Sequence, residues 1–437
     1  MSPTSPNIFR VRHQLREVNE KAYDPEVLAI GPYHHRNDKF KFMEDQKKRC
    51  LEQLKGRNEG SIDRYKLTLR KLEQRARNCY EKINFSQEGD DFLMMMLTDG
   101  YFIVELFRKV ISRESIDEDG PVMHVRRIGT NITRELLLLE NQIPLFVLSE
   151  LYDLTKGPDE DDDFSDVANK FFNLLGESEG EGEHESLREG LSDAAVRFIK
   201  FVLGESEGEG EHESQGEGES QGEHLLHLYH MWRTSDLPET DPQDCIVVMP
   251  SATGKDWIPS ATELRESGVS FKAAQGNGPS GFKFENGTLE IPILRVHDET
   301  ESRLRNLVAY EQHRQSEGIN YFTDYVAFMD CLINTSNDVK MLRRKGIIKN
   351  YLGDDEVIAQ MFNKIGDHVF IYKSYYSGIF RKVNAYHAKP WNTWMAKLRR
   401  DYFHSPWAIF SVLAAIVLLF LTIAQTVVSI LSYIKQS

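Results

Sequence analysis

The C-terminal end of the chain places the strongest constraint on its fold. From Trp407 to Ile434 the sequence reads WAIFSVLAAIVLLFLTIAQTVVSILSYI, without a charged residue. At about 1.5 Å per residue this stretch would form a helix of roughly 40 Å, longer than the roughly 30 Å hydrocarbon core of a bilayer. Core helices seldom run this long without a charged face, so we expect one C-terminal transmembrane helix. Its predicted anchor residues are Trp407, Phe410, Leu413, Leu418, Leu419, Phe420, Leu421, Val427, Ile430 and Tyr433.

The flanks of this stretch indicate its orientation. Lys397, Arg399 and Arg400 precede it, and residues 1–30 contain no apolar run of signal-peptide length. Such a span would leave the ribosome last and insert as a tail anchor, and the basic flank favours a cytoplasmic body. We therefore expect a single-pass membrane protein with its body in the cytoplasm, and the plasma membrane is the favoured location.

Four glycosylation sequons allow a check on this topology. Each sequon has the pattern Asn-X-Ser/Thr, which is a glycan acceptor only when the body is luminal or extracellular. Glycan on any of them would therefore reverse the expected orientation. The acceptor residues are Asn84, Asn131, Asn286 and Asn334.

Apolar periodicity predicts a mainly α-helical body with a small β-hairpin region. The N-terminal part of the body, residues 1–156, and the C-terminal part, residues 224–400, flank an insert, and residues 401–437 form the juxtamembrane segment and anchor. Helices are expected at Phe42–Leu51, Tyr65–Ile83, Asp91–Val110, Leu136–Leu151, Glu299–Gln312, Asp354–Lys364 and elsewhere from Tyr321 onward. Short β-branched runs between Gly-rich breaks predict strands at Cys245–Met249, Val269–Lys272, Phe282–Phe284 and Leu289–Leu294.

The insert, residues 157–223, has a different composition from the rest of the body. The segment GESEGEGEHES occurs at Gly176–Ser186 and again at Gly204–Ser214, each time after a short amphipathic segment. Two copies are too few for a solenoid, which needs about three or more units to bury a core. Gly, Glu and Ser at this density cannot offset the entropy of ordering, so the acidic tails are predicted to be disordered. A tolerated loop expansion is favoured over a specific acidic interaction arm.

Charge and cysteine usage exclude some classes of function. The formal net charge of −15 argues against a nucleic-acid-binding protein, because phosphate binding requires clustered Lys and Arg. The four cysteines are far apart and form no CxxC pair, so neither a disulfide framework nor a zinc site is indicated. Reduced, structural thiols are favoured at Cys50, Cys79, Cys245 and Cys331.

Two segments match known phosphate-binding motifs only in part. Gly276–Gly281 matches GxGxxG, but a strand-like run follows where a dinucleotide site needs a helix. Gly254-Lys255 resembles the end of a phosphate loop, but Asp256 stands where Ser or Thr should bind magnesium. No catalytic residue, cofactor or small-molecule substrate is therefore predicted.

Three histidines with helical spacing resemble part of a metal site. His224, His227 and His230 recur every third residue on a predicted helix, and this spacing can place two imidazoles on one face. Zinc needs a third or fourth ligand, and none stands at a known spacing. Structural or merely exposed histidines are favoured, so no metal ligand is predicted.

The polar run Glu140, Asn141 and Gln142 lies next to Pro144 within an apolar block. Proline should kink or restart a helix here and free backbone groups that polar side chains could satisfy. That structural role is favoured, and binding of a partner by these three residues stays open as the alternative.

A series of short motifs occurs in a fixed order along nearly the whole chain, and its specificity lies in that order. The motifs are Ala29–His34, Met43–Lys47, Leu97–Phe102, Glu105–Phe107, Leu138–Pro144, Pro259–Leu264, Gly268-Val269, Leu289–Pro292, Asn306–Gln312, Phe328–Asn334, Leu342–Ile347, Arg400–Phe403 and Pro406-Trp407. Taken together, this series resembles the plant proteins grouped as domain of unknown function 247.

The resemblance implies a largely helical body, a C-terminal membrane helix and a plant source, without an established reaction. Some grass members of the family are implicated as pollen determinants of self-incompatibility. Our first hypothesis is a non-enzymatic, membrane-anchored protein that contacts lipid through its last helix and binds an unidentified protein partner through its body. A pollen-side recognition factor in self-incompatibility and an enzyme with an unfamiliar site are the alternatives.

Overall fold

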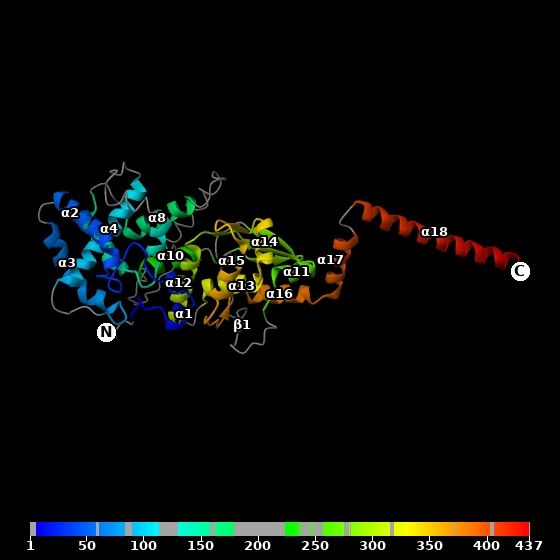
Figure 1. Ribbon diagram of the computed structural model, residues 1–437, viewed down its shortest axis with the longest axis horizontal. Coiled ribbons are helices and arrows are strands. Elements are labelled where there is room, and N and C mark those ends of the chain that lie inside the picture. The colour runs from blue at the N-terminus through cyan, green and yellow to red at the C-terminus, as the bar shows by residue number, and fades with distance from the viewer. Residues whose placement is uncertain are drawn as a thin grey trace, which may run out of the picture.

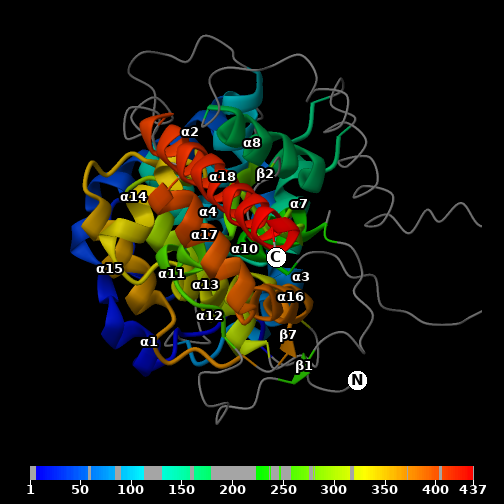
Figure 2. The same ribbon diagram turned by 90° about the vertical axis from the view of Figure 1, so that its right-hand side faces the viewer.

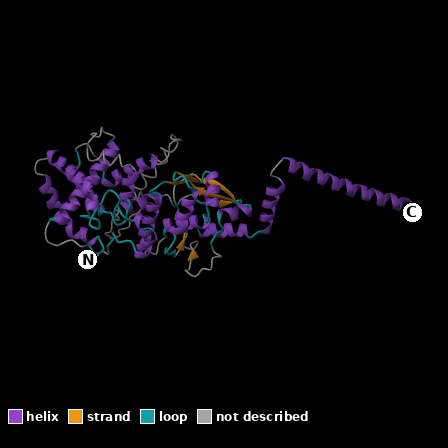
Figure 3. Ribbon diagram, in the orientation of Figure 1, coloured by secondary structure: helices purple, strands orange, loops and turns teal. Residues whose placement is uncertain are grey.

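The chain is mainly helical, as predicted, with one long helix projecting from an elongated body (Figures 1 and 3). This architecture is that of a computed structural model. It describes residues 6–57, 61–83, 90–112, 130–157, 162–178, 223–235, 237, 246–247, 257–274, 279, 281–314, 319–371, 373–402 and 406–436.

The N-terminal part of the body is built around α4 (Asp91–Ser112), whose apolar residues are buried on most sides. Four helices pack against it: α2, α3, α7 and α8. An almost uninterrupted apolar sequence is typical of such a central helix, because most of its surface is shielded from water. The helices of this part are α1 (His13–Val18), α2 (Lys41–Arg57), α3 (Ser61–Asn78), α4, α6 (Thr130–Leu136) and α7 (Leu145–Thr155). They are followed by α8 (Phe164–Ser178) at the start of the insert and by α10 (Leu225–Thr234) at the start of the C-terminal part.

The apolar block Leu136–Leu151 is not one helix, so that part of the prediction was wrong. Helix α6 ends at Leu136 and α7 begins at Leu145, with a loop between them. Pro144 stands at the N-cap position of α7. The predicted restart at Pro144 is confirmed, because proline has no N–H to continue the preceding helix but is tolerated where a new helix begins.

Three small sheets make up the β structure of the described residues. Strands β3 and β4 form the predicted hairpin, and the turn residues Asn286 and Gly287 both have positive φ, 49° and 75°. Two positive φ values are the requirement of the tight hairpin turn that Asn-Gly favours. Strand β2 pairs in parallel with β4, so the three-stranded sheet has the order β2-β4-β3. The strands are β1 (Ile246–Val247), β2 (Ser270–Ala274), β3 (Lys283–Glu285), β4 (Thr288–Pro292), β5 (Leu294–Val296), β6 (Ile348–Asn350) and β7 (Lys373–Ser374).

Helix α12 (Thr300–His313) joins the two parts of the body. It is buried along most of its length and packs both against the short 3-10 helix η1 (Glu20–Ala22) of the N-terminal part and against α13 of the C-terminal part. The buried apolar residues on both sides of it form one continuous core, so residues 1–156 and 224–400 fold together. The remaining helices are α11 (Ala261–Glu266), α13 (Tyr321–Leu332), α14 (Ser336–Arg344), α15 (Asp355–Ile365), α16 (Ser377–His387), α17 (Pro390–Tyr402) and α18 (Pro406–Gln436).

The first helix of the insert belongs to this core. Phe164, Phe171 and Phe172 of α8 are each 2% exposed, and the rings of Phe171 and Phe107 stack with centroids 4.0 Å apart. The core therefore extends past residue 157, where the sequence analysis placed the start of the insert. The first acidic tail, predicted to be disordered, begins at Gly176, but residues 176–178 form the end of α8. The rest of that tail, the second amphipathic segment and the second acidic tail lie in residues 179–222, outside the described residues.

Candidate functional site

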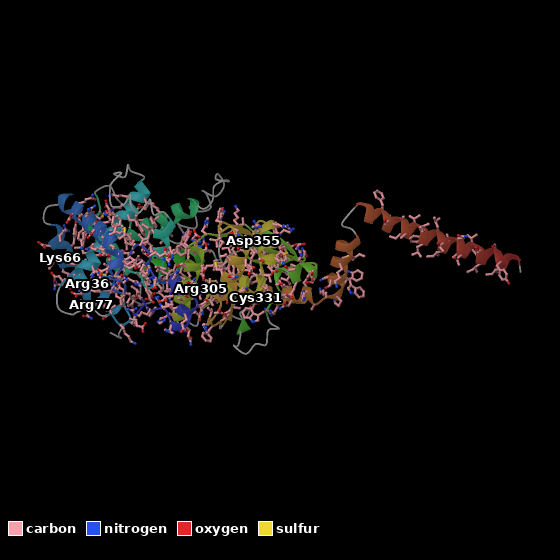
Figure 4. All side chains as sticks on the ribbon, in the orientation of Figure 1. Arg36, Lys66, Arg77, Arg305, Cys331 and Asp355 are labelled. Carbon is pink, nitrogen blue, oxygen red and sulfur yellow. The ribbon has the colours of Figure 1, made fainter. Side chains whose placement is uncertain are left out.

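Helix α18 carries the predicted anchor, and it makes an exposed apolar surface. Leu413–Ile434 is a 22-residue apolar span that contains an 18-residue window of mean hydropathy 2.4, and none of this window is buried against the body. Figure 4 shows its side chains standing clear of the body on all sides. By length and composition this helix could cross a membrane. Exposed anchor residues are Phe410, Leu413, Leu418, Leu419, Phe420, Leu421, Val427, Ile430 and Tyr433, while the Trp407 side chain lies outside the described set.

The polar run beside Pro144 is an internal connector. Glu140, Asn141 and Gln142 are 2%, 1% and 2% exposed. One carboxylate oxygen of Glu140 accepts hydrogen bonds from the Val11 backbone N–H and the Arg16 guanidinium, both at 2.8 Å. These contacts attach the N-terminal segment to the body and hold the Glu140 side chain in the interior.

Asn141 ties two segments of backbone together. Its Oδ1 accepts from the Ile30 N–H at 2.6 Å, and its Nδ2 donates to the Leu28 and Glu135 carbonyls at 2.9 and 3.0 Å. A buried backbone group without a partner costs free energy, so a single amide that satisfies three of them is a strong local constraint. This is the structural role that the sequence favoured.

Gln142 closes the loop between α6 and α7. Its Nε2 donates to the Leu136 and Leu138 carbonyls at 2.8 and 2.7 Å, while its Oε1 accepts from the Leu226 N–H of α10 at 3.1 Å. Its own backbone approaches Gly31 so closely that a Cβ there would lie 2.5 Å from the Gln142 carbonyl oxygen. Since Gly31 also has a φ of +72°, glycine is the residue that this contact accepts.

A buried ion pair lies next to this contact and was missed by the sequence analysis. The Lys47 ammonium contacts Asp99 at 2.7 Å and Glu44 at 2.5 Å, and it donates to the Ala29 carbonyl at 2.5 Å. The second Asp99 oxygen accepts from the Gly31 N–H at 2.9 Å. Burial alone would lower the pKa of Lys47, but the two carboxylates outweigh it and raise that pKa. The ammonium has three acceptors within the chain, one for each of its N–H groups. It is therefore not available as a nucleophile or base.

The three histidines of α10 are structural in this arrangement. The Nδ1 of His224 accepts from the His227 N–H at 3.3 Å, and the Nε2 of His230 lies 2.7 Å from a Glu311 carboxylate oxygen. Burial lowers the pKa of His224 to about 3 and that of His227 further, so both rings are neutral at physiological pH. Across the described ranges, no group of three His, Cys, Asp or Glu side chains is placed to hold a metal ion.

The cysteines follow the same pattern. Cys50, Cys79 and Cys331 are reduced thiols, and Cys245 lies outside the described residues. Burial raises the pKa of Cys79 to about 11 and that of Cys331 to about 12. A protonated thiol is a poor nucleophile, which fits the structural role that the sequence favoured.

A surface hollow between α11 and α14 gathers positive charge. Its volume is about 360 Å³, and its lining includes three cationic side chains and no carboxylate. Such a lining would attract an anion, but the hollow contains no paired acid and base. The lining residues are Thr262, Arg265, Asn337, Lys340, Met341 and Arg344.

Comparison with known proteins agrees with the resemblance seen in the motifs. The UPF0481 protein At3g47200 of Arabidopsis thaliana is 30% identical over 439 residues, which cover 98% of this chain and 87% of that protein. The putative UPF0481 protein At3g02645, from the same plant, is 27% identical over 482 residues, covering 96% and 89%. No solved structure matches the chain. The family model described as plant protein of unknown function, DUF247, matches residues 8–421, and the chain belongs to that family.

Proposed function

We propose that this chain is a non-enzymatic, membrane-anchored protein whose helical body binds another protein. The observation that carries the proposal is the exposed apolar window Leu413–Ile434. Each large apolar side chain gains about 1.5–3 kcal/mol when it leaves water, so an isolated helix of this composition needs an apolar surrounding. Its length matches the hydrocarbon core of a bilayer, which makes lipid the best-fitting surrounding.

The arrangement of the body supports a binding role over a catalytic one. The buried charged and polar side chains described above bond to the chain's own backbone or to each other. Catalytic groups instead need an accessible cleft in which an acid, a base or a nucleophile meets a substrate. The cationic hollow between α11 and α14 offers charge without such a pair.

Alkaline carbonate extraction of the full chain from plant membranes tests the anchor. We expect the wild-type protein to stay in the membrane pellet and a Leu418→Arg, Leu421→Arg variant to move to the supernatant, because charges at the centre of a span oppose insertion. Leu67→Arg is the matched control, since Leu67 is 64% exposed on α3 in the body and its variant should remain in the pellet. Wild-type protein in the supernatant would overturn the anchor.

The sequons at Asn286 and Asn334 test the proposed cytoplasmic orientation. Both residues are exposed, so both would be accessible to glycosylation in the secretory lumen. We expect no change in mass after glycosidase treatment, and the Asn286→Gln and Asn334→Gln variants should migrate like the wild type. A glycosidase-sensitive shift that these substitutions remove would reverse the orientation.

Proximity labelling from the N-terminus in living plant cells tests the binding role. We expect a reproducible set of labelled cytosolic or membrane-associated proteins, at least one of which binds the purified full chain in detergent. Labelled wall or secreted proteins would contradict the cytoplasmic body. A labelled set identical to that of an unrelated protein carrying only the α18 segment would contradict specific binding by the body.

A further inference from the structure

Helix α17 has an apolar face that no other part of the described chain covers. Trp391, Trp394, Met395 and Leu398 are 67%, 70%, 45% and 42% exposed. Their spacing of i, i+3, i+4 and i+7 places them on one side of an α-helix. Two exposed indoles next to two exposed aliphatic side chains form a continuous apolar stripe, which in a folded protein indicates a contact surface.

The position of α17 identifies what covers this stripe. It ends at Tyr402, and α18 begins at Pro406, so the stripe lies immediately before the proposed span. The two helices also contact each other. Figure 2, which looks at the body from the α18 side, shows α17 crossing the end of the body. If α18 crosses a bilayer, the surface of that bilayer is therefore the apolar medium within reach of α17.

The chemistry of α17 matches the boundary between headgroups and acyl chains. Tryptophan favours this boundary because its ring is apolar and its N–H needs a polar partner. Lys397, Arg399 and Arg400 follow the indoles along the same helix, and Asp401 is its only acidic residue. A basic amphipathic helix is attracted to anionic lipid and lies in the plane of the interface.

A second group of cations lies near this helix. Arg265, Lys340 and Arg344 line the hollow between α11 and α14, and α11 packs against both α14 and α17. Figures 1 and 2 both show these three helices at the α18 end of the body. Positive charge on two neighbouring elements complements the negative surface of a cytoplasmic leaflet.

We propose that α17 is an interfacial helix that inserts its Trp391–Leu398 stripe into an anionic phospholipid bilayer, the same bilayer that α18 crosses. The proposal rests on α18 being a membrane span, as proposed above. An interfacial helix attached to the body on one side and to the span on the other fixes how the body sits on the membrane. The body would then present one surface to partners instead of turning freely on a flexible stalk.

Lipid quenching of tryptophan fluorescence tests this proposal on the full chain. The protein is reconstituted into phosphatidylcholine vesicles containing phosphatidylserine, with bromine placed either near the headgroup end or near the methyl end of the acyl chains. The signal of the two α17 indoles is the difference between wild-type protein and a Trp391→Phe, Trp394→Phe variant. We expect this difference signal to be quenched at least about twofold more by the shallow bromine than by the deep one, because interfacial indoles lie near the headgroups.

A matched control uses the opposite end of the body. Leu67 is exposed on α3, and Figure 4 shows the neighbouring Lys66 at the end of the body far from α18. A Leu67→Trp variant adds an exposed indole there. We expect neither bromine position to quench the added signal.

The outcomes separate this proposal from the anchor itself. If the α17 difference signal is unquenched while the chain resists carbonate extraction, α18 spans the membrane and the interfacial helix is refuted. A difference signal that shifts to the blue only with rising protein concentration would assign the stripe to a second copy, and it would also refute the proposal. If carbonate extracts the wild-type chain, the proposal that α18 spans the membrane is refuted, and the interfacial helix, which rests on it, is refuted with it. Equal quenching of the Leu67→Trp signal would show that the body has no fixed orientation.

Discussion

Replacing Asn141 with alanine separates an internal role for the polar run from a partner-binding role. The amide makes three buried hydrogen bonds to backbone groups at 2.6, 2.9 and 3.0 Å. A buried hydrogen bond contributes about 0.5–1.5 kcal/mol net, and a buried group left without a partner costs about 1–3 kcal/mol. We therefore expect Asn141→Ala to lower the free energy of unfolding by about 3–5 kcal/mol, which is a loss of about a hundredfold or more in the ratio of folded to unfolded protein.

Urea unfolding of the full chain in detergent micelles measures this change. Trp232 and Trp257 are partly buried against the core, so their fluorescence reports its loss. Asn337→Ala is the matched control, because Asn337 is exposed on α14, and its free energy of unfolding is expected to stay within about 0.5 kcal/mol of the wild type. The reasoning is refuted if Asn141→Ala is as stable as this control. Loss of a bound partner at unchanged stability would assign the run to binding instead.

Asn141→Asp gives the same test a pH dependence. An ionised carboxylate has no donor for the Leu28 and Glu135 carbonyls, so the oxygen that takes the place of Nδ2 would face two acceptors. Burial raises a carboxyl pKa above its unfolded value, and the folded variant then binds more protons than the unfolded one at intermediate pH. Its stability relative to Asn141→Ala is therefore expected to fall as pH rises from about 4 to about 8. A flat difference over that range would show that the carboxylate escapes to solvent.

Three further substitutions test the core and its charges. Lys47→Met leaves Asp99 buried without its cation and should lower the free energy of unfolding by about 3–5 kcal/mol in the same urea assay. Phe171→Ala should cost about 3–5 kcal/mol because α8 belongs to the core, whereas Phe370→Ala, at a 56% exposed ring, should change stability little. Burial, and to a smaller extent the nearby charge of Asp367, raises the pKa of Asp330 to about 6. The ionisation of Asp330 therefore lowers the free energy of unfolding as pH rises from about 4 through 6. Thermal unfolding should therefore show Asp330→Asn equal to wild type near pH 4 and more stable at pH 7.5.

Features that depend on neighbouring residues could be predicted from the sequence. The charge-free run after Trp407 forms α18, and the Asn-Gly pair at 286–287 forms the β3–β4 turn. Pro144 restarts a helix at Leu145. In each case the controlling physics is local: a helical rise per residue, a positive φ, or a missing N–H.

Features that depend on distant partners could not be predicted. The parallel pairing of β2 with β4 joins segments separated by another strand, and hydrophobic periodicity does not choose between partners. Lys47 and Asp99 look like ordinary surface charges in a helical pattern, and only the tertiary fold removes both from water. The aromatic residues of α8 follow an acidic run, so their place in the core was hidden by composition averaged over the insert.

The motifs that relate this chain to its family are bonded to one another in the interior. The motif Ala29–His34 makes hydrogen bonds to three others. Lys47 of Met43–Lys47 donates to the Ala29 carbonyl, and Asp99 of Leu97–Phe102 accepts from the Gly31 N–H. Asn141 of Leu138–Pro144 accepts from the Ile30 N–H. The motif Leu138–Pro144 also contacts Asn306–Gln312, because the Asn306 Oδ1 accepts a hydrogen bond from the Leu139 N–H at 2.9 Å. Motifs that bond to each other in this way specify how the chain folds and leave the choice of partner to other residues. If the body binds another protein, as proposed, the residues that select this partner are therefore expected on the exposed body surface and on α17, outside the buried run of Glu140, Asn141 and Gln142.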